Sequence, residues 1–83
     1  MNTPKMTLNL IRQYTKTKRE DMAERMGLSS GQQVYKQEAR PNPTVRTLRR
    51  YVDALGGEVI ILVKIDGVVF ELDLPEETNP KAP

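Results

Sequence analysis

The chain has 83 residues, with 13 basic and 11 acidic side chains and neither cysteine nor histidine. Zinc fingers, iron–sulfur sites and catalytic triads built on thiolate or imidazole groups are therefore excluded. Residues 1–50 carry 11 Lys and Arg against four Asp and Glu, whereas residues 51–83 carry two against seven. Such a split is typical of a nucleic-acid-binding half joined to a part with another role.

Two helices are predicted in the first third of the chain. Thr3 and Pro4 are typical of a helix entrance. Thr17, with Glu20 three residues later, fits the capping box of a second helix, which Gly27 should end in a left-handed conformation. The apolar stripes expected to be buried are Met6, Leu10 and Tyr14 with Leu8 and Ile11 alongside in the first helix, and Met22, Ala23 and Met26 in the second.

Two more helices should follow a short polar turn. The third is predicted over residues 32–39, because Pro41 and Pro43 cannot continue it. Thr44 is expected to cap the fourth helix, which Gly56 and Gly57 end. The buried face of that helix should comprise Val45, Leu48, Val52 and Leu55.

Asp66-Gly67 lies between two β-branched runs and predicts a hairpin with a two-residue type I′ turn. This turn would pair Ile65 with Val68 and so set the register of the strands. The expected pairs farther from the turn are Val63–Phe70, Ile61–Leu72, Val59–Leu74, Lys64–Val69, Leu62–Glu71 and Ile60–Asp73.

Both faces of this hairpin carry apolar side chains, and a lone hairpin is marginally stable in water. We therefore expect a two-fold homodimer formed through the hairpin. The alternative is a monomer with a mildly apolar sheet face. The expected interface residues are Ile60, Leu62, Val69 and Phe70.

Four motifs occur in order between about Arg12 and Gly57. They are residues 22–29 (Met-Ala-Glu-Arg-Met-Gly-Leu-Ser), Val34 with Glu38, residues 43–48 (Pro-Thr-Val-Arg-Thr-Leu) and residues 54–57 (Ala-Leu-Gly-Gly). In these motifs the region resembles the Cro/CI-type helix-turn-helix family, also called XRE. This resemblance implies a mainly α, lambda-repressor-like bundle of about four helices with a two-stranded dimerising sheet. The hairpin is similar to that of a subgroup that includes small antitoxins of the HigA and HipB kinds.

The boundaries expected are residues 1–57 for the DNA-binding domain, 58–74 for the dimerising hairpin and 75–83 for a flexible tail. Six residues separate Gly27 from Val34 where the family usually has five, so the register of the recognition helix stays open. Glu38 is expected to bond the backbone or Arg40 rather than to contact cytosine.

Base contacts are expected from the presumed recognition helix. Gln can pair with adenine, Lys can pair with guanine or phosphate, and Tyr can stack on sugar or contact a thymine methyl group. Each of these side chains also has a plain alternative, as a solvated residue at a helix surface or, for the aromatic ring, as a core or interface residue. The candidates are Gln32, Gln33, Tyr35 and Lys36.

Phosphate contacts are expected around the start of the second helix, where two cations accompany free N–H groups. Two serines of the turn, which can also cap the third helix, and polar residues after that helix complete the set. The candidates are Thr17, Lys18, Arg19, Ser29, Ser30, Arg40, Asn42 and Arg46.

The function expected is sequence-specific binding of a palindromic operator in double-stranded DNA by a dimeric autorepressor. The alternative is an antitoxin that neutralises a protein toxin through the acidic segment Glu71, Asp73, Glu76 and Glu77 and also regulates its operon. We expect neither an enzyme nor a cofactor or metal. The longest apolar run has five residues, whereas a membrane helix needs about 20, so a cytoplasmic, nucleoid-associated protein without membrane contact is expected.

Overall fold

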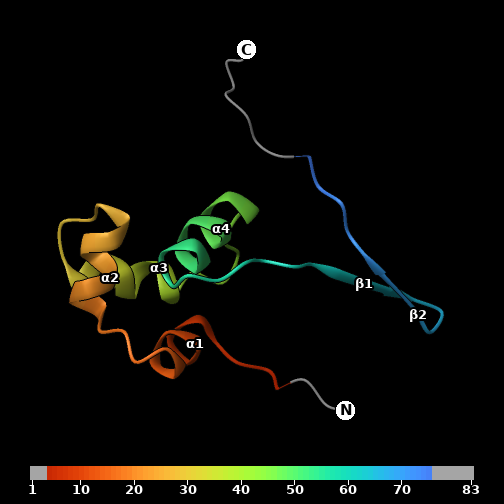
Figure 1. Ribbon diagram of the computed structural model, residues 1–83, viewed down its shortest axis with the longest axis horizontal. Helices are drawn as coiled ribbons and strands as arrows, with labels where there is room; N and C mark the ends of the chain where they lie inside the picture. The colour runs from red at the N-terminus through yellow and green to blue at the C-terminus, as the bar shows by residue number, and fades with distance from the viewer. Residues whose placement is uncertain (1–3, 76–83) are drawn as a thin grey trace.

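The computed structural model describes residues 4–75, which form four helices followed by a two-stranded antiparallel sheet (Figure 1). This architecture confirms the expected mainly α fold with a C-terminal hairpin. The elements in chain order are α1 (Leu8–Tyr14), α2 (Arg19–Met26), α3 (Gly31–Glu38), α4 (Val45–Ala54), β1 (Leu62–Ile65) and β2 (Val68–Glu71).

The core lies between α2, α3 and α4. Met22 and Ala23 of α2 are buried as expected, and they pack with Val34 of α3 and the ring of Tyr51 from α4. The buried position of Tyr51 was not anticipated from the sequence. Partly buried apolar side chains surround this cluster, namely Leu8, Met26, Leu28, Val52, Ala54 and Leu55.

The expected entrance of the first helix is wrong. α1 begins at Leu8, with Thr7 at the cap position, whereas Pro4 has no regular structure and Thr3 lies outside the described residues. A helix begun at Pro4 would need a further turn, and short helices depend on packing against neighbours for their stability. Proline at position 4 is therefore not enough to start the helix, because residues 4–7 are exposed and have no such packing.

The buried face of α1 also differs from the expected one. Leu8 and Ile11 are half-buried and Arg12 is buried. Arg12 sets this rotation, because its guanidinium bonds Glu38 inside the bundle and an unpaired buried charge costs more than an exposed apolar side chain. The stripe expected to be buried is therefore exposed, namely Met6, Leu10 and Tyr14.

The ends of the other helices follow local signals, with one exception. Gly27 ends α2 with φ of 71°, and the hydroxyl oxygen of Thr44 accepts a bond of 3.1 Å from the N–H of Thr47, so both predictions are confirmed. The expected capping box of α2 is wrong, because Lys18 occupies the cap position. The carbonyl of Lys18 accepts the first helical bond, of 2.9 Å, from the N–H of Met22.

The hairpin has the predicted turn and register. Asp66 and Gly67 have φ of 51° and 79°, as a type I′ turn requires. The ladder pairs Ile65 with Val68 at the turn and ends at Leu62 and Glu71. One further backbone bond of 2.8 Å joins residues 61 and 72, whereas the expected pairs of residues 60 and 73 and of residues 59 and 74 lie beyond the ladder.

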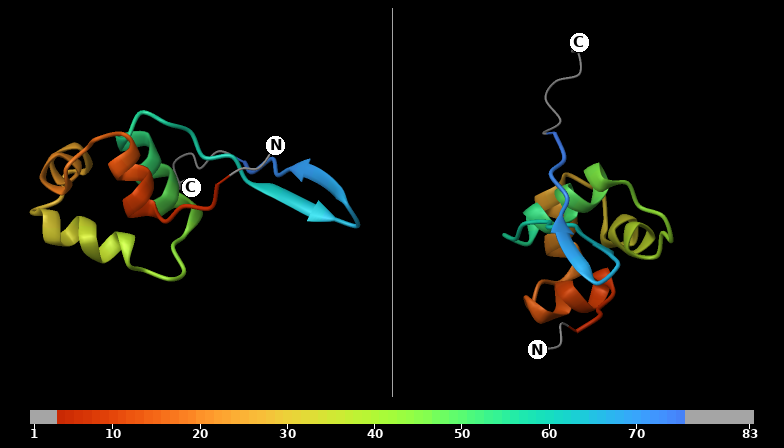
Figure 2. Two further views of the ribbon diagram at one scale, coloured as in Figure 1. Left: turned by 90° about the horizontal axis from the view of Figure 1, so that it is seen from below. Right: turned by 90° about the vertical axis from the view of Figure 1, so that its right-hand side faces the viewer.

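The hairpin projects away from the helices (Figures 1 and 2). In the part of the chain that the structure describes, neither strand contacts a helix. A large share of its apolar side chains is exposed, including all four residues expected at the dimer interface: Ile60, Leu62, Val69 and Phe70. Apart from Pro75, the expected flexible tail of residues 75–83 lies outside the described residues.

Candidate nucleic-acid interface

α2, the turn after Gly27 and α3 form a helix-turn-helix. The two helices approach closely at Gly31, where an added Cβ would lie 3.2 Å from the Cβ of Arg19. A side chain at position 31 would require Arg19 to move by a few tenths of an ångström. The turn therefore brings the start of α3 against the start of α2, and the outward face of α3 remains available.

The outward face of α3 carries the four side chains expected to contact bases. Helical spacing puts them on the side opposite Val34 and Glu38, which face the core. All four are exposed, and they fit a helix that enters the major groove with its N-terminal residues against base edges. They are Gln32, Gln33, Tyr35 and Lys36.

Most of the expected phosphate contacts are also at the surface. Lys18 and Arg19 lie at the start of α2, two serines lie in the turn before α3, and the others lie after α3 and in the first turn of α4. Arg19 is half-exposed and the rest are exposed. The residues in question are Lys18, Arg19, Ser29, Ser30, Arg40, Asn42 and Arg46.

Thr17 is the exception among the expected phosphate contacts. Its side chain is buried, with the hydroxyl oxygen 2.9 Å from that of Thr15. Its N–H donates to the carbonyl of Arg12, and its own carbonyl accepts a bond of 2.9 Å from Nη1 of Arg12. Thr17 therefore stabilises the connection between α1 and α2, and its hydroxyl is not presented at the surface with the other expected phosphate contacts.

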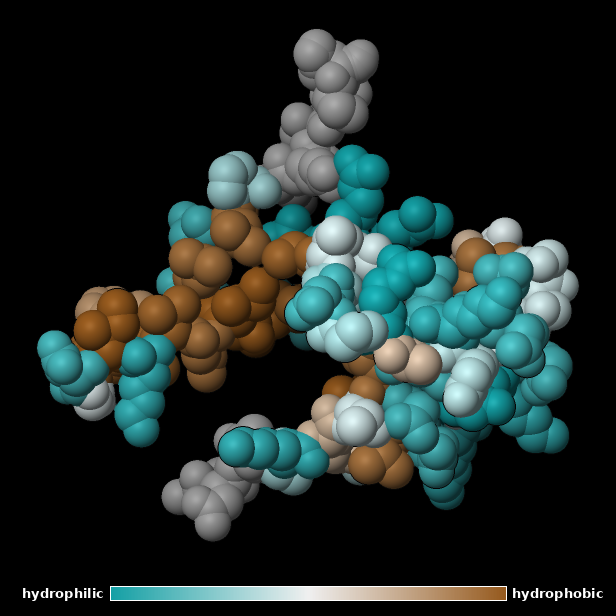
Figure 3. All heavy atoms as spheres, turned by 180° about the vertical axis from the view of Figure 1, so that it is seen from behind, coloured by the Kyte–Doolittle hydropathy of each residue, from teal (hydrophilic) through white to brown (hydrophobic). Residues whose placement is uncertain are grey.

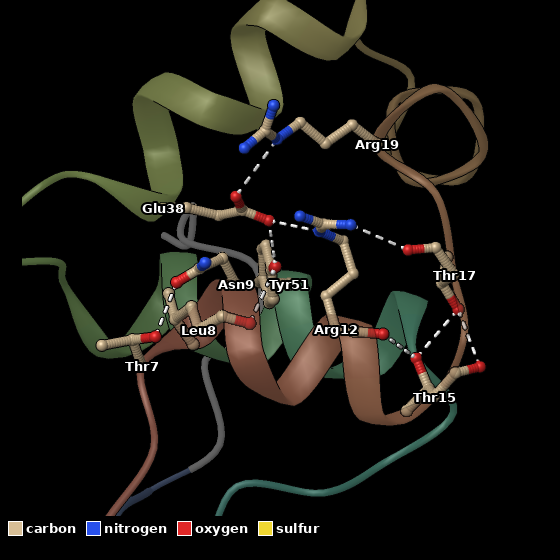
Figure 4. A network of polar contacts seen from close by, with 9 residues as sticks. All are labelled: Thr7, Leu8, Asn9, Arg12, Thr15, Thr17, Arg19, Glu38 and Tyr51. Atoms are coloured by element: carbon tan, nitrogen blue, oxygen red, sulfur yellow. Dashed lines mark hydrogen bonds and ion pairs between the residues drawn. The ribbon is translucent and has the colours of Figure 1, made fainter.

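Glu38 is the centre of a buried polar network that joins all four helices (Figure 4). Its Oε2 accepts a bond of 2.6 Å from Nε of Arg12 in α1 and one of 2.5 Å from the hydroxyl of Tyr51 in α4. The Tyr51 oxygen also lies 3.2 Å from the carbonyl oxygen of Leu8. The carboxylate is 3% exposed, so it cannot reach a base, and its partner is Arg12 rather than the expected Arg40.

The network perturbs two of its members. The hydrogen bond to Glu38 raises the pKa of Arg12 above its ordinary value, although burial opposes this shift. Burial, reinforced by Glu38, raises the pKa of the Tyr51 hydroxyl above its ordinary value. Arg12 therefore stays charged and Tyr51 stays neutral across the physiological range, and together they fix the end of α3 in the bundle.

Arg19 connects this network to the outward face of α3. Its Nε lies 3.6 Å from Oε1 of Glu38, and its guanidinium carbon lies 5.0 Å from the centre of the Tyr35 ring. Figure 4 shows the side chain running from α2 toward Glu38. The Arg19 guanidinium thus helps to position Tyr35, one of the expected base-contacting residues, by a cation–π contact.

Sequence patterns did not identify this network. Periodicity assigns charged residues such as Arg12 to the surface. It also placed Tyr51 outside the expected buried face of the fourth helix. One signal was present, since Glu38 is an acidic residue on an otherwise basic recognition helix and lies on the same helical side as the buried Val34.

None of the helices in the described ranges is long and apolar enough to cross a membrane. Among residues 4–75 no three His, Cys, Asp or Glu side chains gather in a way that could hold a metal ion.

The chain matches no family model and no curated protein sequence. It is similar to two solved structures, each with a TM-score of 0.73 and each matched over 89% of this chain. One, described as "DNA bound antitoxin HigA3", is 30% identical and is matched over 97% of its length. The other, described as "Induced DNA bending by unique dimerization of HigA antitoxin", is 28% identical and is matched over its full length.

Proposed function

We propose that this chain, which belongs to the HigA-like antitoxins, binds double-stranded DNA as a homodimer and represses transcription of its own operon. The finer assignment to the Cro/CI-type family is part of this proposal. It is supported by the motifs of residues 22–29 and 43–48 and by the helix-turn-helix of α2 and α3.

One observation carries the proposal most strongly. α3 presents Gln32, Gln33 and Lys36 outward, while Val34 and Glu38 hold its opposite side in the core. Glutamine can pair bidentately with adenine, and lysine can bond guanine or phosphate. A rigidly held helix with this face is suited to reading base edges, and α3 is held from all three other helices through Glu38.

The surrounding cations would provide the nonspecific part of the affinity. Lys18, Arg40 and Arg46 are exposed, and Arg19, which follows Lys18 in the sequence, is half-exposed. Each neutralised phosphate contributes about 0.9 to the slope of log affinity against log salt concentration. Three acidic residues, Asp66, Glu71 and Asp73, lie in the hairpin or directly after it, away from α3 (Figure 2), where they would not repel the DNA.

A homodimer explains how such a small domain would become specific. Two copies of α3 related by a two-fold axis would enter successive major grooves, about 34 Å apart, on a palindromic site. The hairpin residues Ile60, Leu62, Val69 and Phe70 are exposed in one chain and would form the centre of the contact between copies.

The test is a titration of the purified protein on the DNA upstream of its gene, at several salt concentrations and against shuffled DNA of equal composition. Wild-type protein should prefer its own upstream DNA by at least about 1,000-fold, with a steep salt slope. Gln33→Ala should lose about 1–3 kcal/mol of discrimination. Gln13→Ala, an exposed glutamine of α1, is the matched control and should behave as wild type.

Two results would contradict the proposal. Equal affinity for shuffled DNA would contradict sequence-specific recognition. Binding that does not depend on salt concentration would contradict the phosphate contacts. A Gln33→Ala variant that keeps full discrimination would leave DNA binding intact but would place the base contacts elsewhere.

A second candidate function is neutralisation of a protein toxin. It is favoured by the similarity to two HigA antitoxins and by exposed acidic residues after the turn of the hairpin, Glu71 and Asp73. A cationic partner would find a complementary surface there. The test is co-expression with the reading frame next to the gene. Co-purification and rescue of growth support an antitoxin, whereas a neighbour that is neither toxic nor bound contradicts it.

A further inference from the structure

Three exposed apolar side chains form a stripe along α1 and the residues just before it. Leu10 and Tyr14 lie one turn apart on α1 and Met6 precedes the helix; the exposed fractions are 40% for Met6, 45% for Leu10 and 81% for Tyr14. The opposite side of α1 already makes the contact with the core through Leu8 and Arg12. The stripe lies outside the core cluster of the described residues, and Leu10 and Tyr14 have the spacing of a packed helix face.

A second unpartnered apolar surface lies on the hairpin. Val63, Ile65, Val68 and Phe70 alternate along the two strands and share one face. Every member of this face is apolar, and three of the four are more than half exposed. The opposite face is mixed, since it carries Lys64 and Glu71. The wholly apolar face gains most from being removed from water.

Open space separates the hairpin from α1. Figure 3 shows the apolar hairpin on one side of this space and the lower edge of the bundle, where Figure 1 places α1, on the other. The two do not contact each other within one chain. A second hairpin that pairs with the first, as in the proposed dimer, would occupy this space and would lie next to α1.

The charges around the two surfaces are complementary. Exposed Lys5 and Lys16 flank the stripe on α1, whereas exposed Glu71 and Asp73 follow the apolar face on β2. Opposite charges at the rim favour one orientation of the two surfaces over others.

We propose that the hairpin of one copy packs its apolar face, Val63, Ile65, Val68 and Phe70, on the Met6–Leu10–Tyr14 stripe of a second copy. This inference rests on the proposed homodimer and adds a contact from α1 to the hairpin interface. Each helix-turn-helix would then be held to the dimer by the partner's hairpin as well as by its own linker. This second connection would fix the spacing between the two α3 helices. The linker of residues 55–61 alone, which joins the hairpin to its own bundle, would not fix that spacing.

The absence of cysteine from the chain allows a direct test by disulfide formation. One copy carries Leu10→Cys, and a second copy of different mass carries Phe70→Cys. The two are mixed, left to exchange subunits and then oxidised mildly. A disulfide between the two different copies is expected in most of the protein. Gln33→Cys mixed with Phe70→Cys is the matched control and should give no such product, because Gln33 lies on the outward face of α3.

A second variant measures the contribution of the stripe to association. Tyr14→Lys alters a side chain that is 81% exposed in the single chain, so folding should be unchanged by circular dichroism. Sedimentation should show a dimer dissociation constant raised at least tenfold. Gln13→Lys, also exposed on α1, adds the same charge beside the stripe and should leave the dissociation constant within about threefold of the wild type.

The outcomes separate this inference from the proposed dimer. A dimer that forms normally, without the Leu10–Phe70 disulfide and without an effect of Tyr14→Lys, would overturn the docking and leave the hairpin dimer in place. A wild-type chain that stays monomeric would overturn both. If Tyr14→Lys left the dimer intact but abolished binding of a co-expressed toxin, the stripe would belong to that partner and the inference would be wrong.

Discussion

Replacing Glu38 with leucine removes the acceptor at which all four helices meet. The side chains of Arg12 and Glu38 are 7% and 3% exposed, so the substitution leaves a buried guanidinium without its counter-charge. Breaking such a pair from one side costs about 3–5 kcal/mol. A domain of this size is stable by roughly 4–12 kcal/mol, at about 0.05–0.15 kcal/mol per residue. Glu38→Leu should therefore leave the fold marginal.

The double variant Arg12→Met with Glu38→Leu should recover most of that loss. Two apolar side chains then fill the volume of the pair, and no charge is left buried. Tyr51 keeps the carbonyl of Leu8 as an acceptor, whereas the carbonyl of Thr17 loses its donor. One lost partner costs about 1–3 kcal/mol, and the coupling between the two positions should exceed about 2 kcal/mol.

The free energy of unfolding is measured by urea denaturation, followed by far-ultraviolet circular dichroism at one fixed protein concentration. The concentration must be fixed because association would add to the apparent stability. If each single variant costs less than about 1 kcal/mol, or if the double variant costs the sum of the two, Glu38 is not the buried centre of the fold.

Three further variants test individual parts of the structure by the same unfolding measurement. Thr44→Ala removes the bond to the N–H of Thr47 and should cost about 1 kcal/mol, and no loss would mean that the cap is unimportant. Gly27→Ala meets no neighbouring atom but has φ of 71°, so it should cost about 1 kcal/mol through its backbone alone. Tyr51→Phe should cost about 1–3 kcal/mol near neutral pH. Because the folded pKa of Tyr51 is raised, its stabilisation is complete below the pKa of unfolded tyrosine, about 10, and shrinks as pH rises above that value. A Tyr51→Phe effect that does not shrink in alkali would contradict the buried, neutral hydroxyl.

Local signals predicted two helix boundaries and the hairpin, because each of these depends on a few neighbouring residues. Gly27 and Thr44 end or begin helices where expected, and Asp66-Gly67 fixes the strand register by its turn geometry. The exposure of Gln32 and Lys36 agrees with the helical spacing that places Val34 in the core. These features need no information from distant parts of the chain.

The errors have a local and a distant origin. Thr17 fits a capping box, but near neighbours compete for it, because its hydroxyl bonds Thr15 and its carbonyl bonds Arg12. The rotation of α1 depends on Arg12 reaching Glu38, 26 residues away in sequence. A window of neighbouring residues contains no trace of such a partner, so apolar periodicity alone favoured the wrong face of α1.

Sequence-specific recognition by α3 is tested most directly by chemical protection of the DNA upstream of the gene. Wild-type protein should protect guanine and adenine edges in two major-groove segments about 34 Å apart, on one face of the DNA. The variant with Gln32→Ala and Gln33→Ala, properly folded, should lose this pattern while keeping salt-dependent binding. The same protection pattern from that variant, or protection without the spacing of one helical turn, would contradict recognition through α3.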